Sequence, residues 1–210
     1  MPLLYKQQNG ACVGIWEMTE TVDELKNMLG SIALSSPSVS MEIRSEARQK
    51  ERLTALVLLK ELLGHEAIIS HEESGAPFLP EENLNISISH TKGYAAMILY
   101  KEKEIGIDIE YRSDRVKKIK SRFVNEAEAL HISPENETEH LLIHWCAKET
   151  LFKMIGCNEV DFLKHLHISP FIYNKEGIIN VSESRTENQK SYKLYFRVAD
   201  NFVITYTSCE

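Results

Sequence analysis

Two acidic side chains occupy alternate positions of an otherwise apolar segment, Ile105-Gly106-Ile107-Asp108-Ile109-Glu110. If this segment is a β-strand, Asp108 and Glu110 point to the same face, about 7 Å apart along the strand. Two carboxylates on one face repel each other unless a cation lies nearby. Oxygen ligands of this kind suit Mg²⁺, which takes one or two carboxylates and completes its shell with water and phosphate oxygens. An exposed strand end, where both side chains meet solvent, explains the pair equally well.

A second candidate segment is Trp145-Cys146-Ala147-Lys148-Glu149-Thr150-Leu151-Phe152-Lys153. On a helix, Trp145, Glu149 and Lys153 are spaced i, i+4, i+8 and share one stripe. A Glu-to-Lys pair at this spacing is common on plain surface helices. Here, however, Trp145 begins the same stripe and the neighbouring helix residues are apolar. This pattern indicates that the charged pair lies beside a buried surface. Such a pair requires partners.

Basic residues form two groups in an acidic protein, which has 24 Lys and Arg against 31 Asp and Glu and a net charge of −7. Arg44, Arg48 and Arg52 recur every four residues and form one helical stripe, which is either a solvated face or a phosphate-facing one. The second group comprises Arg115, Lys117, Lys118, Lys120 and Arg122. Because the overall charge is negative, non-specific binding to nucleic acid or to a membrane surface is not expected.

Several common catalytic patterns are missing from the sequence. The nine glycines form neither G-x-G-x-x-G nor a P-loop, and no G-x-S-x-G occurs. The pairs His140/His144 and His165/His167 have spacings that can bind a metal, but no third ligand is evident. Because a zinc site needs three or four converging ligands, we interpret both pairs as structural or surface histidines.

The elements that position these residues follow from hydrophobic periodicity and from the Gly and Pro positions. Helices are expected over 22–29, 41–63 and 134–155, with a loop over 31–40. Strands are expected over 12–16, 86–90, 94–100, 105–110, 166–169, 171–173, 178–181, 192–198 and 202–207. The strands over 86–90, 94–100 and 105–110 are expected to form a meander, because short turns separate them.

Each half of the 210-residue chain therefore combines a long helix with a group of strands. With 43% hydrophobic and 26% charged residues, the chain is long enough to bury a substantial core. We expect an α+β fold of two similar lobes, residues 1–103 and 104–210. The four cysteines are widely spaced, and we see neither a signal peptide nor a membrane span. These features predict a cytoplasmic protein with reduced thiols.

Three segments, in this order, resemble motifs of the 4′-phosphopantetheinyl transferase superfamily, in its two-lobed surfactin-synthetase-activating branch. Asn85-Ile86-Ser87-Ile88-Ser89-His90-Thr91 is similar to the N-x-S-H-S segment, with two extra residues after the asparagine. Ile105–Glu110 resembles G-[IV]-D-x-E, and Trp145–Lys153 resembles W-x-x-K-E-x-x-x-K. The detailed resemblance covers roughly residues 74–160. It implies two lobes of similar topology with coenzyme A and Mg²⁺ in the cleft between them.

The resemblance also implies a reaction, in which the 4′-phosphopantetheine arm of coenzyme A moves to a serine of a carrier protein and 3′,5′-ADP is released. Asp108, Glu110 and Glu149 are then expected to bind Mg²⁺. Glu149, directly or through a water molecule, deprotonates the serine, and Lys153 stabilises or protonates the leaving phosphate. The residues expected to contact coenzyme A are Arg48, Arg52, Pro77, Ser89, His90 and Lys148. Charge neutralisation and positioning are what phosphoryl transfer requires of a protein.

The expected partner is an acyl or peptidyl carrier protein, which is typically acidic around its serine. The basic group from Arg115 to Arg122 is predicted to steer that carrier by charge complementarity. A monomer is expected, because two lobes can build the site within one chain. The sequence departs from the family where Gly75-Ala76-Pro77 replaces the usual G-K-P, whose lysine contacts coenzyme A.

Two other functions stay open on the sequence alone. One is a binding relative that holds coenzyme A or a carrier without turnover, for which Ala76 is the hint. The other is a Mg²⁺-dependent hydrolase that uses the same carboxylates on a pyrophosphate bond without a carrier.

Overall fold

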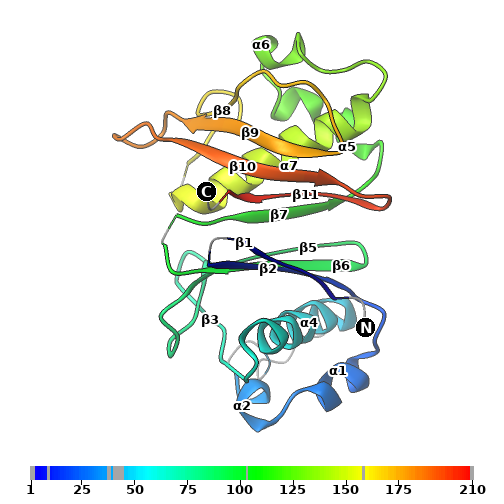
Figure 1. The fold of residues 1–210 in the computed structure, drawn as a ribbon, viewed down its shortest axis with the longest axis vertical. Coiled ribbons are helices and arrows are strands. Elements are labelled where there is room, and N and C mark those ends of the chain that lie inside the picture. The colour runs from blue at the N-terminus through cyan, green and yellow to red at the C-terminus, as the bar shows by residue number, and fades with distance from the viewer. Residues whose placement is uncertain are drawn as a thin grey trace. The chain divides into compact units, whose positions relative to one another are not determined.

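The computed structural model in Figure 1 describes residues 3–8, 10–36, 39, 45–102, 104–157 and 159–208. Helices and antiparallel sheets alternate along these residues, so the protein has a mixed α/β fold. The contacts between residues group the chain into two compact units. The first ends at Ile105, and the second runs from Gly106 to Ser208. Among the described residues, no helix is long and apolar enough to cross a membrane.

The first unit is built on a four-stranded antiparallel sheet with the order β1-β2-β6-β5. Its strands are β1 (Leu3–Gln8), β2 (Ala11–Glu17), β5 (Asn85–Thr91) and β6 (Tyr94–Tyr100). Helix α4 (Glu46–Leu63) lies along one face of this sheet (Figure 1) and contacts β2 and β6. Gly14 permits this close approach, because a Cβ there would lie 2.8 Å from Cδ1 of Leu58.

Smaller elements complete the first unit. Helices α1 (Val22–Met28) and α2 (Ser31–Leu34) precede α4, and the two-residue strands β3 (Ser70–His71) and β4 (Pro77–Phe78) pair after it. Thr21 caps α1 in a reciprocal capping box with Glu24, which fixes where that helix begins.

The second unit is a five-stranded antiparallel sheet with the order β7-β11-β10-β9-β8, packed against helix α7 (Glu137–Ile155). Its strands are β7 (Ile107–Tyr111), β8 (Leu166–Ile168), β9 (Glu176–Glu183), β10 (Ser191–Val198) and β11 (Phe202–Thr207). Short helical segments α5 (Arg115–Ile119), η1 (Lys120–Arg122) and α6 (Glu126–Ala129) join β7 to α7. Gly156 ends α7 in the left-handed conformation (φ 56°).

The predicted meander is wrong in its third strand. Strands β5 and β6 form the expected hairpin, but β7 pairs with β11 and belongs to the other sheet. The reason is that the boundary between the compact units falls at Ile105 and Gly106, before β7 begins.

Several predicted boundaries also differ from the structure. Helix α4 begins after Ser45, whose backbone is extended (φ −96°, ψ 115°), and residues 41–44, Arg44 included, lie outside the described residues. Helix α7 begins at Glu137 rather than Pro134, because the Ser133 N–H bonds to Nδ1 of His140 and residues before Glu137 form a turn. The expected loop over 31–40 contains α2. Residues 171–173 form a loop, where Phe171 packs against histidine rings of α7.

Candidate active site

The two alternating carboxylates lie on β7, on the side that faces α7. Asp108 is opposite Thr205 of β11 and Glu110 is opposite Val203. Asp108 is buried, with 5% of its surface exposed, and Glu110 is half-buried. Gly106 allows the start of this strand to approach the helix, because a Cβ there would lie 2.5 Å from the Thr150 carbonyl oxygen. The strand therefore presents both carboxylates to α7.

Two side chains of the predicted α7 stripe bind to this strand. Lys153 Nζ lies 2.8 Å from Oδ1 of Asp108 and also donates to the Ile107 carbonyl oxygen at 2.9 Å. About two turns earlier in the helix, Trp145 Nε1 donates to Oε1 of Glu110 at 3.0 Å. The helical stripe and the alternating strand face, each read from the sequence alone, thus meet in the structure.

Glu149 lies between these two contacts on the same stripe. The pKa of Glu149 is raised to about 7, chiefly by burial and also by the charges of Asp108 and Glu110, while Lys153 opposes the rise. A carboxyl group with this pKa is partly protonated near neutral pH, so it can both accept and donate a proton. Part of this shift comes from the negative charges of Asp108 and Glu110 on β7.

Asp108 and Glu110 are carboxylates, the type of oxygen ligand that Mg²⁺ prefers. Mg²⁺ takes one or two protein carboxylates and fills its other positions with water and phosphate oxygens. Among the residues that the structure describes, no three His, Cys, Asp or Glu side chains are grouped to hold a metal ion. The carboxylates of β7, whose negative charges raise the pKa of Glu149, are nevertheless a pair that a divalent cation would stabilise.

Lys148, which was predicted to contact coenzyme A, has its ammonium group inside the second unit. Its side chain is fully buried and binds Oε2 of Glu128 at 2.8 Å and the Phe162 carbonyl oxygen at 2.9 Å. Burial lowers the pKa of Lys148, and the hydrogen bond to Glu128 raises it. Sequence reasoning missed Glu128. Its capping box with Asn125 was a readable signal for a helix start, but not for a buried ion pair.

Four of the other predicted coenzyme A contacts line one cavity of about 350 Å³ in the first unit. They are Arg48, Arg52, Pro77 and His90. His90 Nε2 lies 3.0 Å from Oε2 of Glu51. Burial lowers the pKa of His71 in the same cavity, and the charge of Arg52 lowers it further, so this ring is neutral at pH 7. Ser89 is buried and alternates with His90 along β5, so it points to the opposite face of the sheet.

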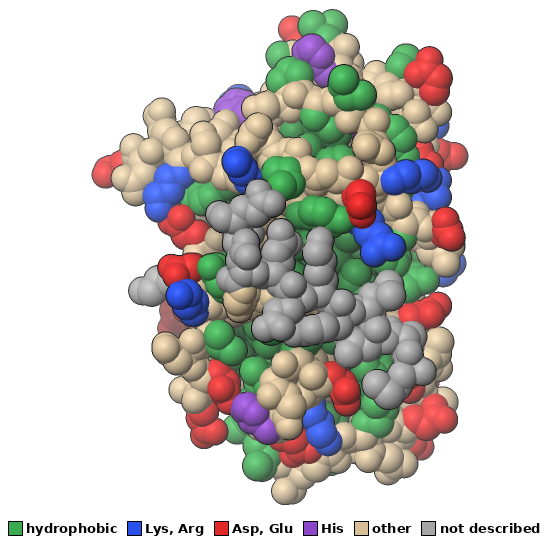
Figure 2. Space-filling view, viewed as in Figure 1, with side chains coloured by type: hydrophobic (Ala, Val, Ile, Leu, Met, Phe, Trp, Pro, Cys, Tyr) green, Lys and Arg blue, Asp and Glu red, His purple; other side chains and the backbone are tan. Residues whose placement is uncertain are grey.

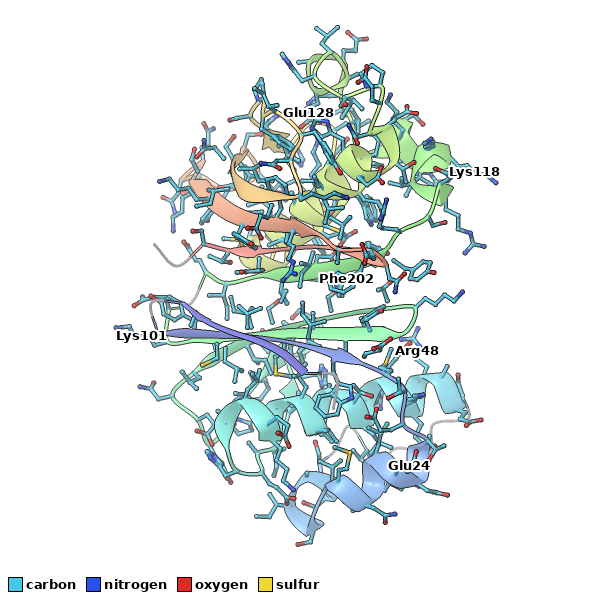
Figure 3. All side chains as sticks on the ribbon, turned by 45° about the vertical axis from the view of Figure 1, so that its right-hand side comes forward. Glu24, Arg48, Lys101, Lys118, Glu128 and Phe202 are labelled. Atoms are coloured by element: carbon cyan, nitrogen blue, oxygen red, sulfur yellow. The ribbon has the colours of Figure 1, made fainter. Side chains whose placement is uncertain are left out.

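The predicted basic group lies on α5 and η1, and part of it is neutralised. Lys117 Nζ contacts Asp114 at 3.2 Å and Glu137 at 3.6 Å, and Lys120 contacts Glu137 at 3.5 Å. Figure 2 accordingly shows basic and acidic side chains intermixed near α5. Lys118 is exposed and extends away from the helix (Figure 3), and Arg115 and Arg122 are also exposed.

Comparison with known families assigns residues 104–207 to a family model described as the 4′-phosphopantetheinyl transferase superfamily. The matched segment contains β7, α7 and every element of the second sheet. It therefore includes the carboxylates and the α7 stripe that meet in the structure. No curated protein matches the chain.

Proposed function

The chain belongs to the 4′-phosphopantetheinyl transferase superfamily, and from that premise we propose that it transfers the 4′-phosphopantetheine arm of coenzyme A to a serine of an apo carrier protein. The proposed reaction depends on Mg²⁺ and releases 3′,5′-ADP. The observation that carries the proposal is the meeting of β7 and α7, where Lys153 binds Asp108 and Trp145 binds Glu110. Both elements lie inside the segment that the family model matches.

In the proposed reaction the serine oxygen forms a bond to the phosphorus that carries the pantetheine arm. The bond from that phosphorus to the bridging pyrophosphate oxygen breaks, and 3′,5′-ADP leaves. Glu149 takes the serine proton, a role that its pKa of about 7 supports. Lys153 supplies positive charge to the leaving phosphate. Asp108 and Glu110, with Glu149, would hold Mg²⁺, which neutralises charge on the pyrophosphate oxygens.

We assign the cavity of the first unit to the nucleotide end of coenzyme A. Arg48 and Arg52 line it, and guanidinium groups bind phosphate oxygens through paired hydrogen bonds. Arg48 lies near the N-terminal end of α4 (Figure 3), and His90, whose Nε2 contacts Glu51, lines the cavity from β5. The proposal requires both units to contact one coenzyme A molecule. The surfactin-type subtype, a monomeric state and a cytoplasmic location are parts of the same proposal.

The proposed carrier is acyl or peptidyl and acidic around its serine. Lys118 and Arg122, with the equally exposed Arg115, are the candidates to attract it, whereas Lys117 and Lys120 are paired with Glu137. We expect charge reversal at Lys118 and Arg122 to raise the KM for the carrier and to leave the KM for coenzyme A unchanged. An unchanged carrier KM would show that this surface is merely solvated.

The direct test is to incubate an apo acyl carrier protein with the enzyme, coenzyme A and Mg²⁺ and to measure the intact mass of the carrier. We expect a mass gain of one phosphopantetheinyl group. The gain should disappear with EDTA and with Glu149→Gln. Glu126→Gln is the matched control, because Glu126 is an exposed carboxylate of the same unit and should leave transfer intact.

The same mixture separates the rival functions. Binding of coenzyme A without a mass gain on any acyl or peptidyl carrier would favour a binding relative that has lost turnover. Cleavage of coenzyme A without a carrier would favour a Mg²⁺-dependent pyrophosphate hydrolase.

A further inference from the structure

A cavity of about 170 Å³ lies in the second unit, away from β7 and the carboxylates that it carries. Its lining comes from α6, from the first half of α7 and from β8 with the loop that follows it. The lining residues that matter here are Ala127, His131, His140, His144, His167 and Phe171. Figure 2 shows a histidine side chain beside hydrophobic ones over α6, and Figure 3 labels Glu128, which belongs to α6.

His140 lines this cavity and carries a buried hydrogen-bond donor. Its side chain is 1% exposed, and its Nδ1 accepts a hydrogen bond from the Ser133 N–H at 3.0 Å. A neutral imidazole that accepts at Nδ1 carries its proton on Nε2. His140 Nε2 is buried and has no hydrogen-bond partner among the described residues. Buried polar groups are normally paired, so this donor calls for a partner that the described part of the chain does not supply.

His144, one turn later on α7, contributes an acceptor. Its Nδ1 lies 2.9 Å from the His140 carbonyl oxygen, which can only accept, so Nδ1 carries the proton and Nε2 carries a lone pair. Burial lowers the pKa of His144 to about 3, so the ring is neutral at pH 7. The His140 and His144 rings are 5.1 Å apart between centroids. Two neighbouring rings of the cavity lining therefore carry a neutral donor, at His140, and a neutral acceptor, at His144.

The same lining carries an aromatic surface. Phe171 stacks against His144 with centroids 5.3 Å apart and meets the edge of His140 at 4.5 Å. An aromatic ring beside a donor and an acceptor favours a flat ligand with apolar faces and a polar edge.

The lining does not suit an ion. In the part of the chain that the structure describes, no three His, Cys, Asp or Glu side chains are grouped to hold a metal. Nδ1 of His140 is occupied by Ser133, which leaves His144 Nε2 as the acceptor nitrogen of this pair. Glu128, the charged residue of the lining, already binds Lys148, the Ile168 N–H and the Asn125 N–H. Burial lowers the pKa of both His140 and His144, so at these two rings a neutral ligand fits better than an ion.

We propose that this cavity is a second small-molecule site, which takes a flat neutral ligand with an amide edge, such as a primary carboxamide or a lactam ring. The ligand carbonyl accepts from His140 Nε2–H, the ligand N–H donates to His144 Nε2, and Phe171 covers one end of the ring. This site lies apart from the proposed transferase chemistry and does not depend on it.

The test is a titration of the full chain, labelled with ¹⁵N at histidine, followed by NMR. The probes are nicotinamide, which has the carboxamide edge, nicotinate, which has a carboxylate in its place, and pyridine, which has neither. We expect nicotinamide to give saturable shifts at His140 and His144, and nicotinate and pyridine to bind at least tenfold more weakly. Equal binding of the three probes, or no saturable shift with nicotinamide, would overturn the proposal.

Two variants on α6 test the location without altering the buried histidines. Ala127 lines the cavity and is exposed, so Ala127→Trp should block the cavity and abolish the nicotinamide shifts. Ala129→Trp is the matched control, because Ala129 is exposed on the same short helix and should leave binding intact. Circular dichroism checks that both variants fold. Nicotinamide shifts that persist in Ala127→Trp would place the ligand elsewhere and overturn the proposal.

Discussion

Trp145 of α7 donates its indole N–H to Oε1 of Glu110 on β7, and the two atoms are 3.0 Å apart. This hydrogen bond orients Glu110, one of the proposed metal ligands, although Trp145 is not itself a ligand. Groups that orient metal ligands in this way typically change metal affinity by 10–100-fold when they are removed. Trp145 is the first residue of the stripe that contains Glu149 and Lys153. Helix α7 therefore contacts both carboxylates of β7 and supplies the ammonium group of Lys153.

Trp145→Phe should therefore weaken Mg²⁺ binding about tenfold, because it keeps the aromatic packing and removes the donor to Glu110. The measurement is a calorimetric Mg²⁺ titration of the protein in the presence of coenzyme A. Trp16→Phe is the matched control, since Trp16 donates to Glu20 at 3.0 Å in the first unit. Equal Mg²⁺ affinity in both variants would show that Trp145 does not orient a metal ligand.

Glu149 should make the metal-free protein less stable as the pH rises. Its folded pKa of about 7 exceeds the ordinary value of 4.5, so between these values the folded state holds a proton that the unfolded chain has released. The free energy of unfolding therefore falls as pH rises through this window, by on the order of 1 kcal/mol for this partly exposed group. Glu149→Gln removes the effect.

Urea unfolding at pH 5 and pH 8 in EDTA measures this difference. Glu149→Gln should gain stability relative to the wild type at pH 8, whereas Glu126→Gln should follow the wild type at both pH values. A pH dependence of unfolding that is identical in Glu149→Gln and the wild type would refute the assignment.

The buried pair of Lys148 and Glu128 should contribute to folding rather than to coenzyme A binding. Lys148→Met leaves Glu128 buried without its cation, which typically costs about 3–5 kcal/mol. The double variant Lys148→Met/Glu128→Gln should recover part of this loss. Urea unfolding and the KM for coenzyme A separate the two roles. A large rise in KM with little loss of stability would instead support the phosphate contact predicted from the motif.

The local part of the site could be predicted from the sequence, because strand alternation and helical spacing are local properties. Asp108 and Glu110 alternate on a strand, and the Trp145–Lys153 stripe lies on a helix, as expected. The strand that pairs with β7 could not be predicted. Short turns favour pairing between neighbouring strands, but β7 pairs with β11, far along the chain.

The buried partners also escaped prediction, because they depend on tertiary contacts. Lys148 resembles a phosphate contact in its motif, yet its ammonium group meets Glu128 from a separate short helix. The spacing of His140 and His144 predicts structural or surface side chains, and nothing in the sequence indicates the cavity that they line. A hydrogen bond such as that from Ser133 to His140, which settles a tautomer, is visible only in the structure.

His144 should make the second unit sensitive to acid. Its folded pKa of about 3 lies below the ordinary 6.5, because the ring is buried and lies near His140 and Lys148. Below pH 6.5 the unfolded chain binds a proton that the folded state excludes. The free energy of unfolding is thus lost as pH falls from 6.5 towards 3, at up to about 1.4 kcal/mol per pH unit.

Urea unfolding at pH 7 and pH 5 tests this expectation. His144→Gln should lose less stability between these pH values than the wild type, and the exposed His131→Gln should match the wild type. If the three proteins lose stability equally, the acid sensitivity comes from other groups.

Ala76 should limit the affinity for coenzyme A. It is exposed between Gly75 and Pro77, which both line the cavity that contains Arg48 and Arg52. A lysine at this position would add a cation at the cavity edge, and a charge-assisted contact to phosphate is roughly twice as strong as a neutral one. Ala76→Lys should therefore lower the KM for coenzyme A several-fold, and the effect should weaken at high salt. Ala76→Met, which adds length without charge, is the control in the same carrier mass assay. If Ala76→Met lowers the KM as much as Ala76→Lys, the gain in affinity comes from apolar contact. A positive charge at this position would then not contribute to coenzyme A binding.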